Sequence, residues 1–177
     1  MFLSLFLLKS MKMETKIEIN EASSKFKDVS IAPMHTAEHI LNQTRVRMFG
    51  CERSRNAHIE KKKSKCDYIL QTAPTPEQIT AIEEKVNEII ASNLPILIEF
   101  VAKEAVAQEI DLSKLPKNAS NTLRIVRIGD YDTCACIGVH VENTAEIGKF
   151  KIISTDYQNN TLRIRFKLEG TPANTKF

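Results

Sequence analysis

The feature that most constrains the fold is a pair of segments near the C-terminus, residues 150–157 and 162–168, separated by the polar tetrapeptide Gln-Asn-Asn-Thr. In the second segment apolar and basic residues alternate, which in a strand places them on opposite faces. The apolar set is Leu162, Ile164, Phe166 and Leu168, and the basic set is Arg163, Arg165 and Lys167. The pattern predicts an antiparallel hairpin with one face that other elements must cover.

Two helices are predicted to supply that cover. The first spans Met34–Phe49, after Pro33 and before Gly50, because proline is favoured at a helix start and glycine at its end. The second begins at Thr75-Pro76-Glu77-Gln78, a capping box with a first-position proline, and runs to about Asn93. Its apolar residues recur at helical spacing: Ile79, Ile82, Val86, Ile89 and Ile90.

Further strands are predicted at 95–101 and 123–128, and two short ones within 57–70. Strands interleaved in this way with two helices predict an α+β fold, in which the helices pack on a mainly antiparallel sheet. We therefore expect a single domain of two layers.

The length of 177 residues suits one domain with one sizeable core. We expect that domain at 31–170, between an N-terminal extension at 1–30 and a C-terminal tail at 171–177. The extension opens with an apolar run that has no basic region before it and is too short to span a bilayer. We interpret Met11 or Met13 as the true start; an edge strand or a tag-like extension is the alternative.

Charge and cysteine content limit the partners and the compartment. The net charge of +3 is small, so a nucleic acid would have to be bound by a local basic patch rather than by the field of the whole chain. The 4 cysteines lack the spacing of a secreted disulfide framework, which predicts a reducing, cytoplasmic location. The chain is too short for a full ATP-dependent ligase, and no ATP site is evident.

Two of the 4 histidines, His35 and His39, lie four positions apart on the first predicted helix. This spacing places both imidazoles on one face, about one turn apart, where they can bind one metal ion. A metalloprotease is disfavoured, because Thr36 stands where the helical zinc motif of that class has its catalytic glutamate.

A second pair, Cys136 and His140, has the same spacing and brackets Gly138. The two pairs together would supply one thiolate and three imidazoles, a ligand set suited to zinc. Either pair alone would favour a buried cysteine and satisfied core histidines. Both pairs in a chain with only 4 histidines favour a single metal site.

Three segments of the sequence resemble a known family. HTAEHIL (35–41) and CIGVHVENTAEIGKFKI (136–152) resemble the paired HxxxH and CxxxH motifs of the editing domain of alanyl-tRNA synthetase and of its free-standing relatives, the AlaX proteins. TPEQITAIEEKVNEIIASNLPI (75–96) resembles the helix between those motifs, so the likeness covers about residues 33–168.

The related editing domain of threonyl-tRNA synthetase shares the ligand pattern and the glycine that matches Gly138. Thr36 and the run Asn143-Thr144-Ala145-Glu146-Ile147-Gly148 favour the alanyl branch. The likeness therefore points first to alanyl-tRNA editing.

The resemblance implies a protein that acts in trans on mischarged tRNA, hydrolysing the ester of seryl- or glycyl-tRNA for alanine at the 3′ acceptor end. It also implies one Zn²⁺ ion, with ligands at His35, His39, Cys136 and His140; whether all four bind at once stays open. Two alternatives remain. One is editing of seryl-tRNA for threonine, and the other is a non-catalytic zinc and tRNA-binding module associated with a synthetase.

Two departures from the alanyl pattern affect the expected site walls. The pattern CGGTH becomes CIGVH, with Ile137 and Val139, and the glutamine that the family has before Gly-Ser is missing near Arg55-Asn56-Ala57-His58. Because recognition of a serine hydroxyl requires placed hydrogen-bond partners, the amino acid that is removed stays open.

Three polar residues are candidates for roles around the metal. Thr36 is the candidate to donate a hydrogen bond to the substrate, and His58 is a candidate proton shuttle if its strand borders the metal. Asp67 is a candidate to orient a ligand histidine. The alternative for Thr36 is a helix position that faces solvent. The alternatives for His58 and Asp67 are a solvent-facing strand position and a surface turn.

Basic residues form candidate phosphate contacts for tRNA. A lysine run in this position can also be the solvated tip of a hairpin. The candidates are Lys61, Lys62, Lys63 and Lys65, with Arg53, Arg55, Arg163 and Arg165.

Overall fold

The structure is a computed structural model that describes residues 28–106, 110, 112 and 121–171. Its helices are α1 (Ala32–Phe49) and α2 (Pro76–Ala91). Almost all of the predicted N-terminal extension and most of the predicted C-terminal tail lie outside the described residues. Within the described ranges, no helix is both long and apolar enough to cross a bilayer.

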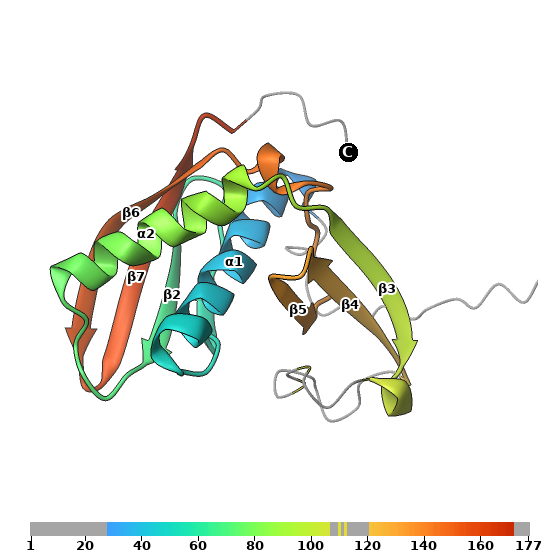
Figure 1. Cartoon of the computed structure of the whole chain (residues 1–177), viewed down its shortest axis with the longest axis horizontal. Helices are drawn as coiled ribbons and strands as arrows, with labels where there is room; N and C mark the ends of the chain where they lie inside the picture. The colour runs from blue at the N-terminus through green and yellow to red at the C-terminus, as the bar shows by residue number, and fades with distance from the viewer. Residues whose placement is uncertain (1–27, 107–109, 111, 113–120, 172–177) are drawn as a thin grey trace, which may run out of the picture.

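The strands form two antiparallel sheets, ordered β1-β2-β7-β6 and β3-β4-β5. Figure 1 shows α1 and α2 against the larger sheet, with the smaller sheet on the other side of α1. The strands are β1 (Asn56–His58), β2 (Ser64–Ile69), β3 (Ile96–Ala102), β4 (Thr122–Ile128), β5 (Asp132–Ala135), β6 (Lys149–Gln158) and β7 (Thr161–Glu169). Short 3-10 turns are η2 (Val29–Ile31), η3 (Lys103–Ala105) and η4 (Thr144–Glu146).

The α+β class is confirmed, but the expectation of one sheet is not, because the strands divide between two. The reason lies in α1, where every residue from Ala32 to Arg45 except Gln43 is buried. A helix that is buried around its whole circumference needs cover on more than one side. The larger sheet and α2 cover one side, and β5 of the smaller sheet contacts α1 on another.

The predicted hairpin and the second helix form as expected. Asn159 and Asn160 both have positive φ (49° and 57°), the geometry that suits a two-residue hairpin turn. The apolar residues of β7 point into the core: Leu162, Ile164 and Phe166 are buried. The capping box at the start of α2 is present, with Thr75 and Gln78 bonded to each other's backbone.

Candidate metal centre

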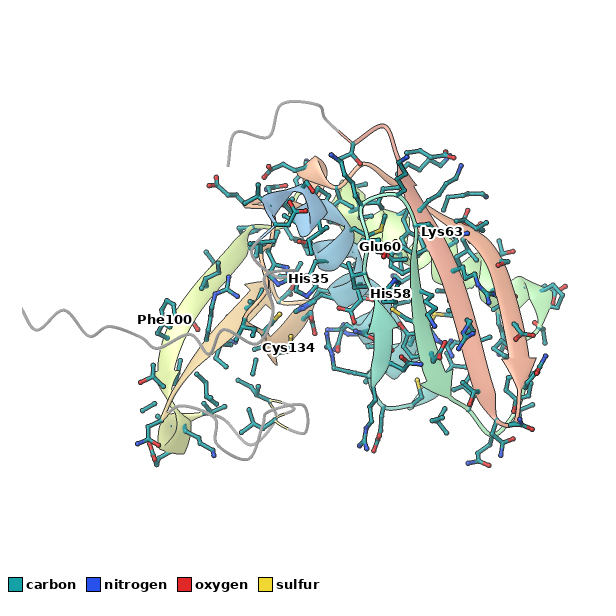
Figure 2. The ribbon with its side chains drawn as sticks, turned by 180° about the vertical axis from the view of Figure 1, so that it is seen from behind. His35, His58, Glu60, Lys63, Phe100 and Cys134 are labelled. Atoms are coloured by element: carbon teal, nitrogen blue, oxygen red, sulfur yellow. The ribbon has the colours of Figure 1, made fainter. Side chains whose placement is uncertain are left out.

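Four side chains converge where α1 faces the smaller sheet. The ligand atoms of His35, His39, Cys136 and His140 all lie within 4.8 Å of one another. The first two come from the early turns of α1, and the others come from the loop that follows β5. The structure thus brings together two pairs that are about a hundred residues apart in the sequence. Figure 2 labels His35 on α1 beside Cys134 of β5.

Each of the three imidazoles uses its Nδ1 atom for a contact within the protein. Nδ1 of His35 lies 3.1 Å from the Val139 carbonyl, and Nδ1 of His140 lies 3.1 Å from Oγ1 of Thr36. Nδ1 of His39 lies 3.2 Å from the Cys134 sulfur and 3.4 Å from the Asp132 carboxylate. Partners of this kind fix the ring orientation and the tautomer, and they leave Nε2 as the nitrogen for a metal.

Thr36 has a different set of partners from the one we expected. Its side chain is fully buried, and its Oγ1 donates to the Ala32 carbonyl at 2.8 Å. The same oxygen contacts His140 and accepts a 3.3 Å hydrogen bond from the Val141 amide. The hydroxyl therefore joins α1 to the chain around His140, which is a positioning role.

The loop that carries the second ligand pair is held by Arg124 of β4. One guanidinium nitrogen of Arg124 donates to two carbonyls of this loop, Cys136 O at 2.6 Å and Gly138 O at 2.9 Å. The amide of Gly138 in turn donates to the Cys136 sulfur at 3.4 Å. These hydrogen bonds hold the backbone around Cys136 and thereby set the position of its sulfur.

Gly138 is required by the close approach of a ligand ring. A Cβ atom added at Gly138 would lie 2.1 Å from Cε1 and 2.5 Å from Nδ1 of His35. Contacts this short do not occur between real atoms, so any side chain at this position would displace the imidazole or the loop.

We therefore expect Gly138→Ala to lower the free energy of unfolding by about 1–3 kcal/mol, as overpacking of a closed site does. Urea denaturation would measure the change. The control is the same substitution in a His35→Ala background, where the clashing ring is absent and the cost should largely disappear. An equal cost in both backgrounds would contradict the steric explanation.

The charges of the cluster favour the metal-binding forms of Cys136 and His140. Burial opposes protonation of His39, but Cys134, Cys136 and Asp132 outweigh it and raise the pKa of His39 well above its usual value. Burial opposes ionisation of the Cys136 thiol, but the charge of His39 and hydrogen bonds from the histidines outweigh it and lower the pKa of Cys136 well below its usual value. Burial and the nearby charge of His39 lower the pKa of His140 to about 3. A thiolate and a neutral imidazole are the forms that bind a metal.

These residues fit zinc on two further observations. The Cys136 sulfur lies 3.6 Å from Nε2 of His35. Tetrahedral zinc, with bonds of about 2.3 Å to sulfur and about 2.0 Å to nitrogen, would separate two such ligands by roughly 3.5 Å. Nε2 of His140 is buried and has no hydrogen-bond partner among the described residues. A buried nitrogen without a partner is costly unless a ligand occupies it.

Behind His39 lies a buried ion pair that the motif reasoning missed. Arg53, from the segment after α1, binds the Asp132 carboxylate through two nitrogens at 2.6 and 3.1 Å. Burial opposes ionisation of Asp132, but hydrogen bonds from His39 and Arg53 lower its pKa to about 2. A charged carboxylate therefore lies against His39. Strand alternation could have found it, since Asp132, Cys134 and Cys136 occupy every second position.

Asp67 and His58 lie elsewhere. The Asp67 carboxylate binds Arg163 at 2.7 and 2.8 Å and Asn56 at 2.7 Å. Asp132, rather than the candidate Asp67, lies beside a histidine of the cluster. His58 is exposed on the edge strand β1, where its Nε2 lies 2.8 Å from Glu60. It is not a member of the four-residue cluster, and Figure 2 shows it on β1 with Glu60 nearby.

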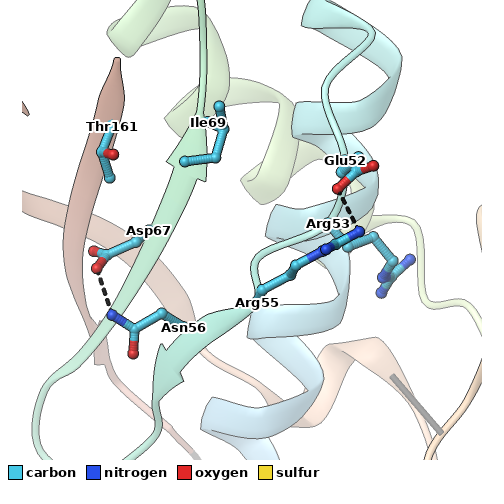
Figure 3. Close-up of a pocket in the computed structure, with 7 residues that line it drawn as sticks. All are labelled: Glu52, Arg53, Arg55, Asn56, Asp67, Ile69 and Thr161. Atoms are coloured by element: carbon cyan, nitrogen blue, oxygen red, sulfur yellow. Dashed lines mark hydrogen bonds and ion pairs between the residues drawn. The ribbon is translucent and has the colours of Figure 1, made fainter. Parts of the chain in front are cut away.

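The candidate tRNA-binding residues lie around the larger sheet. Lys61, Lys62 and Lys63 are exposed between β1 and β2, and Lys65 and Arg165 are paired positions on β2 and β7. Arg55 makes an exposed 2.8 Å ion pair with Glu52. Figure 3 shows this pair and the Asn56–Asp67 contact lining a surface pocket, which contains none of the four clustered residues. Arg53 and Arg163 are already bound to Asp132 and Asp67.

Part of the chain matches a known protein family, and most of it is similar to a segment of alanine–tRNA ligases. Residues 123–165 match the family described as the threonyl and alanyl tRNA synthetase second additional domain. The chain resembles an AlaX-type alanyl-tRNA editing domain. Alanine–tRNA ligase of Fervidobacterium nodosum is 31% identical over 148 residues, covering 81% of this chain and 17% of the ligase. That of a Thermoanaerobacter species is 30% identical over 165 residues, covering 93% and 18%.

The alanine–tRNA ligase of Hyperthermus butylicus is 34% identical over 138 residues, which are 76% of this chain and 15% of the ligase. The AlaX-like chain thus spans less than a fifth of the length of these relatives. The matched family segment contains all of β4 except its first residue, all of β5, and both Cys136 and His140. The likeness therefore includes the half of the cluster that lies after β5.

Proposed function

We propose that this AlaX-like chain is a zinc-dependent aminoacyl-tRNA deacylase that works in trans on seryl- or glycyl-tRNA for alanine. The observation that carries the proposal is the convergence of His35, His39, Cys136 and His140 within 4.8 Å. When bound there, zinc would supply a Lewis acid that polarises the ester carbonyl or activates a water. The relation to alanine–tRNA ligases supports the choice of ester and of tRNA.

The residues of the chain define how a substrate would approach. His35 and His39 are buried, whereas Cys136 and His140 are half-buried, so the acceptor end would enter from the side of the loop after β5. Thr36 orients His140, and Asp132 orients His39. Ile137, which is 54% exposed and lies between Cys136 and His140 in this loop, is our candidate to contact the amino-acid side chain.

The test is a deacylation panel with purified protein. Seryl-, glycyl- and alanyl-tRNA for alanine and seryl-tRNA for threonine would each be incubated with the protein, with and without a chelator. We expect the seryl- or glycyl-ester of the alanine tRNA to be cleared, and chelation to stop the reaction. Clearance of seryl-tRNA for threonine alone would move the activity to the other branch. Bound zinc without turnover on any substrate would leave a non-catalytic module.

We propose that tRNA phosphates bind along the basic outer surface of the larger sheet. His58, Lys65 and Arg165 occupy one row across β1, β2 and β7. Lys65 and Arg165 face away from the helices, because their neighbours Cys66 and Ile164 are buried in the core.

Replacing Lys61, Lys62 and Lys63 together by alanine should weaken tRNA binding and flatten its salt dependence. Each lost phosphate contact should lower the slope of log K against log salt by about 0.7–0.9. Filter binding at several salt concentrations would measure this. Lys85→Ala on α2, which removes a lysine already paired with Glu88, is the control. An unchanged slope in the triple variant would remove the lysines from the interface.

A further inference from the structure

The smaller sheet exposes two apolar side chains on the face that carries the metal cluster. Phe100 is 52% exposed and Ile98 is 46% exposed, both on the edge strand β3. In the antiparallel register Phe100 pairs with Arg124, and the Cys136 amide donates to the Arg124 carbonyl at 3.0 Å. Residues that pair directly across strands share a face. Phe100, Arg124 and Cys136 therefore form one row.

The adjacent row across the three strands also begins at an exposed apolar side chain of β3. Ile98 pairs with Val126, which pairs with Cys134. Neighbouring strands lie about 4.8 Å apart, so Phe100 is roughly 10 Å from the backbone of Cys136. Between them Arg124 is held by the carbonyls of Cys136 and Gly138. Figure 2 shows Phe100 on β3 and Cys134 on β5 of this sheet.

The chemistry of the proposed substrate indicates what covers this surface. The scissile ester is attached to the ribose of the terminal adenosine, so the adenine must lie within one nucleoside of the cluster. An exposed aromatic ring is the usual partner for an unpaired base, because every base presents a π-face. Neither of the two rows contains an acidic residue that would repel the sugar-phosphate chain.

We propose that Phe100, flanked by Ile98, is the stacking platform for the 3′-terminal adenine of tRNA. This inference rests on the proposed function, since it names the nucleoside that the same site receives. Strand addition at the edge is less favoured, because Glu99, in the middle of β3, is charged and paired with Arg127.

Tryptophan fluorescence tests the platform directly. The chain has no tryptophan, so Phe100→Trp creates a single reporter. Leu97→Trp is the matched control, because Leu97 is equally exposed, at 52%, on the opposite face of the same strand. We expect the trinucleotide CCA to quench Phe100→Trp in a saturable manner and to leave Leu97→Trp unchanged. Equal quenching of both, or of neither, would overturn the platform. If AMP binds Phe100→Trp as tightly as CCA does, the surface is a site for free nucleotides, and the assignment to tRNA would be overturned.

Kinetics on mischarged tRNA give the second arm. Phe100→Ala should lower kcat/KM roughly 5- to 150-fold, the range expected for loss of one base stack. The loss should appear mainly as a higher KM. Phe100→Tyr should keep most of the wild-type kcat/KM, and Leu97→Ala should leave kcat/KM unchanged. An unchanged KM in Phe100→Ala would refute the inference while leaving the deacylase intact. Fluorescence quenching without any deacylation would support the platform and refute only the enzyme.

Sedimentation velocity addresses the rival occupant, a second copy of the chain. The platform predicts that wild type and Phe100→Ala sediment alike. A wild-type dimer that Phe100→Ala dissociates would overturn the assignment to adenine.

Discussion

Replacing Cys136 by alanine is expected to remove bound zinc and to lower deacylation by about a thousandfold or more. The cluster would keep three imidazoles but lose its only thiolate, and the His35 nitrogen 3.6 Å from that sulfur would lose its neighbour. Metal-ion catalysis is worth several kcal/mol, and each 1.4 kcal/mol is a tenfold change in rate.

Two measurements are needed, because loss of metal alone would follow for a structural ion as well. Zinc per chain would be measured by elemental analysis, and the rate by single-turnover hydrolysis of seryl-tRNA. Cys51→Ala is the matched control: Cys51 is also half-buried, but its thiol bonds to the Arg45 carbonyl outside the cluster. A Cys136→Ala protein that keeps both zinc and activity would contradict the assigned ligand set.

Replacing Arg53 by methionine is expected to destabilise the fold by about 3–5 kcal/mol, because it would leave the Asp132 carboxylate buried without its cation. The side chains of this pair are only 9% and 1% exposed. The same change would loosen His39, whose Nδ1 lies 3.4 Å from that carboxylate. Loss of such a supporting contact lowers metal affinity by about 10- to 100-fold.

Chemical denaturation would measure the stability, and the absorption spectrum of the cobalt-substituted protein would report the ligand geometry. Adding Asp132→Asn to Arg53→Met removes the unpaired charge and should recover part of the stability. The matched control is Arg127→Met, whose 2.8 Å pair with Glu99 is 39% and 46% exposed and should cost only about 0–1 kcal/mol. Equal losses for the two variants would show that the buried pair has no special role.

Local patterns in the sequence predicted much of the secondary structure and the members of the cluster. The alternation through 162–168 predicted β7, and the Thr75–Gln78 capping box predicted the start of α2. The two spacings of four predicted which residues converge at one point. Each of these signals depends on residues a few positions apart, where backbone geometry alone relates the side chains.

Contacts between distant segments could not be predicted in this way. Arg53 and Asp132 are 79 positions apart, and Arg124 binds its two carbonyls through a register that no short pattern specifies. The second sheet could not be predicted either. Alternation of apolar and polar residues shows that a segment is a strand, but it does not show which strand that segment pairs with.

The sequence by itself thus determined the α+β class, the hairpin, the helix caps and the four clustered side chains, because these follow from periodicity and motif spacing. The tertiary structure alone decided that two sheets enclose α1, that Asp132 rather than Asp67 supports His39, and that Phe100 shares a face with Cys136. These outcomes depend on packing. The burial of α1 around its whole circumference brings β5 against it, and with β5 come the loop and the carboxylate that complete the site.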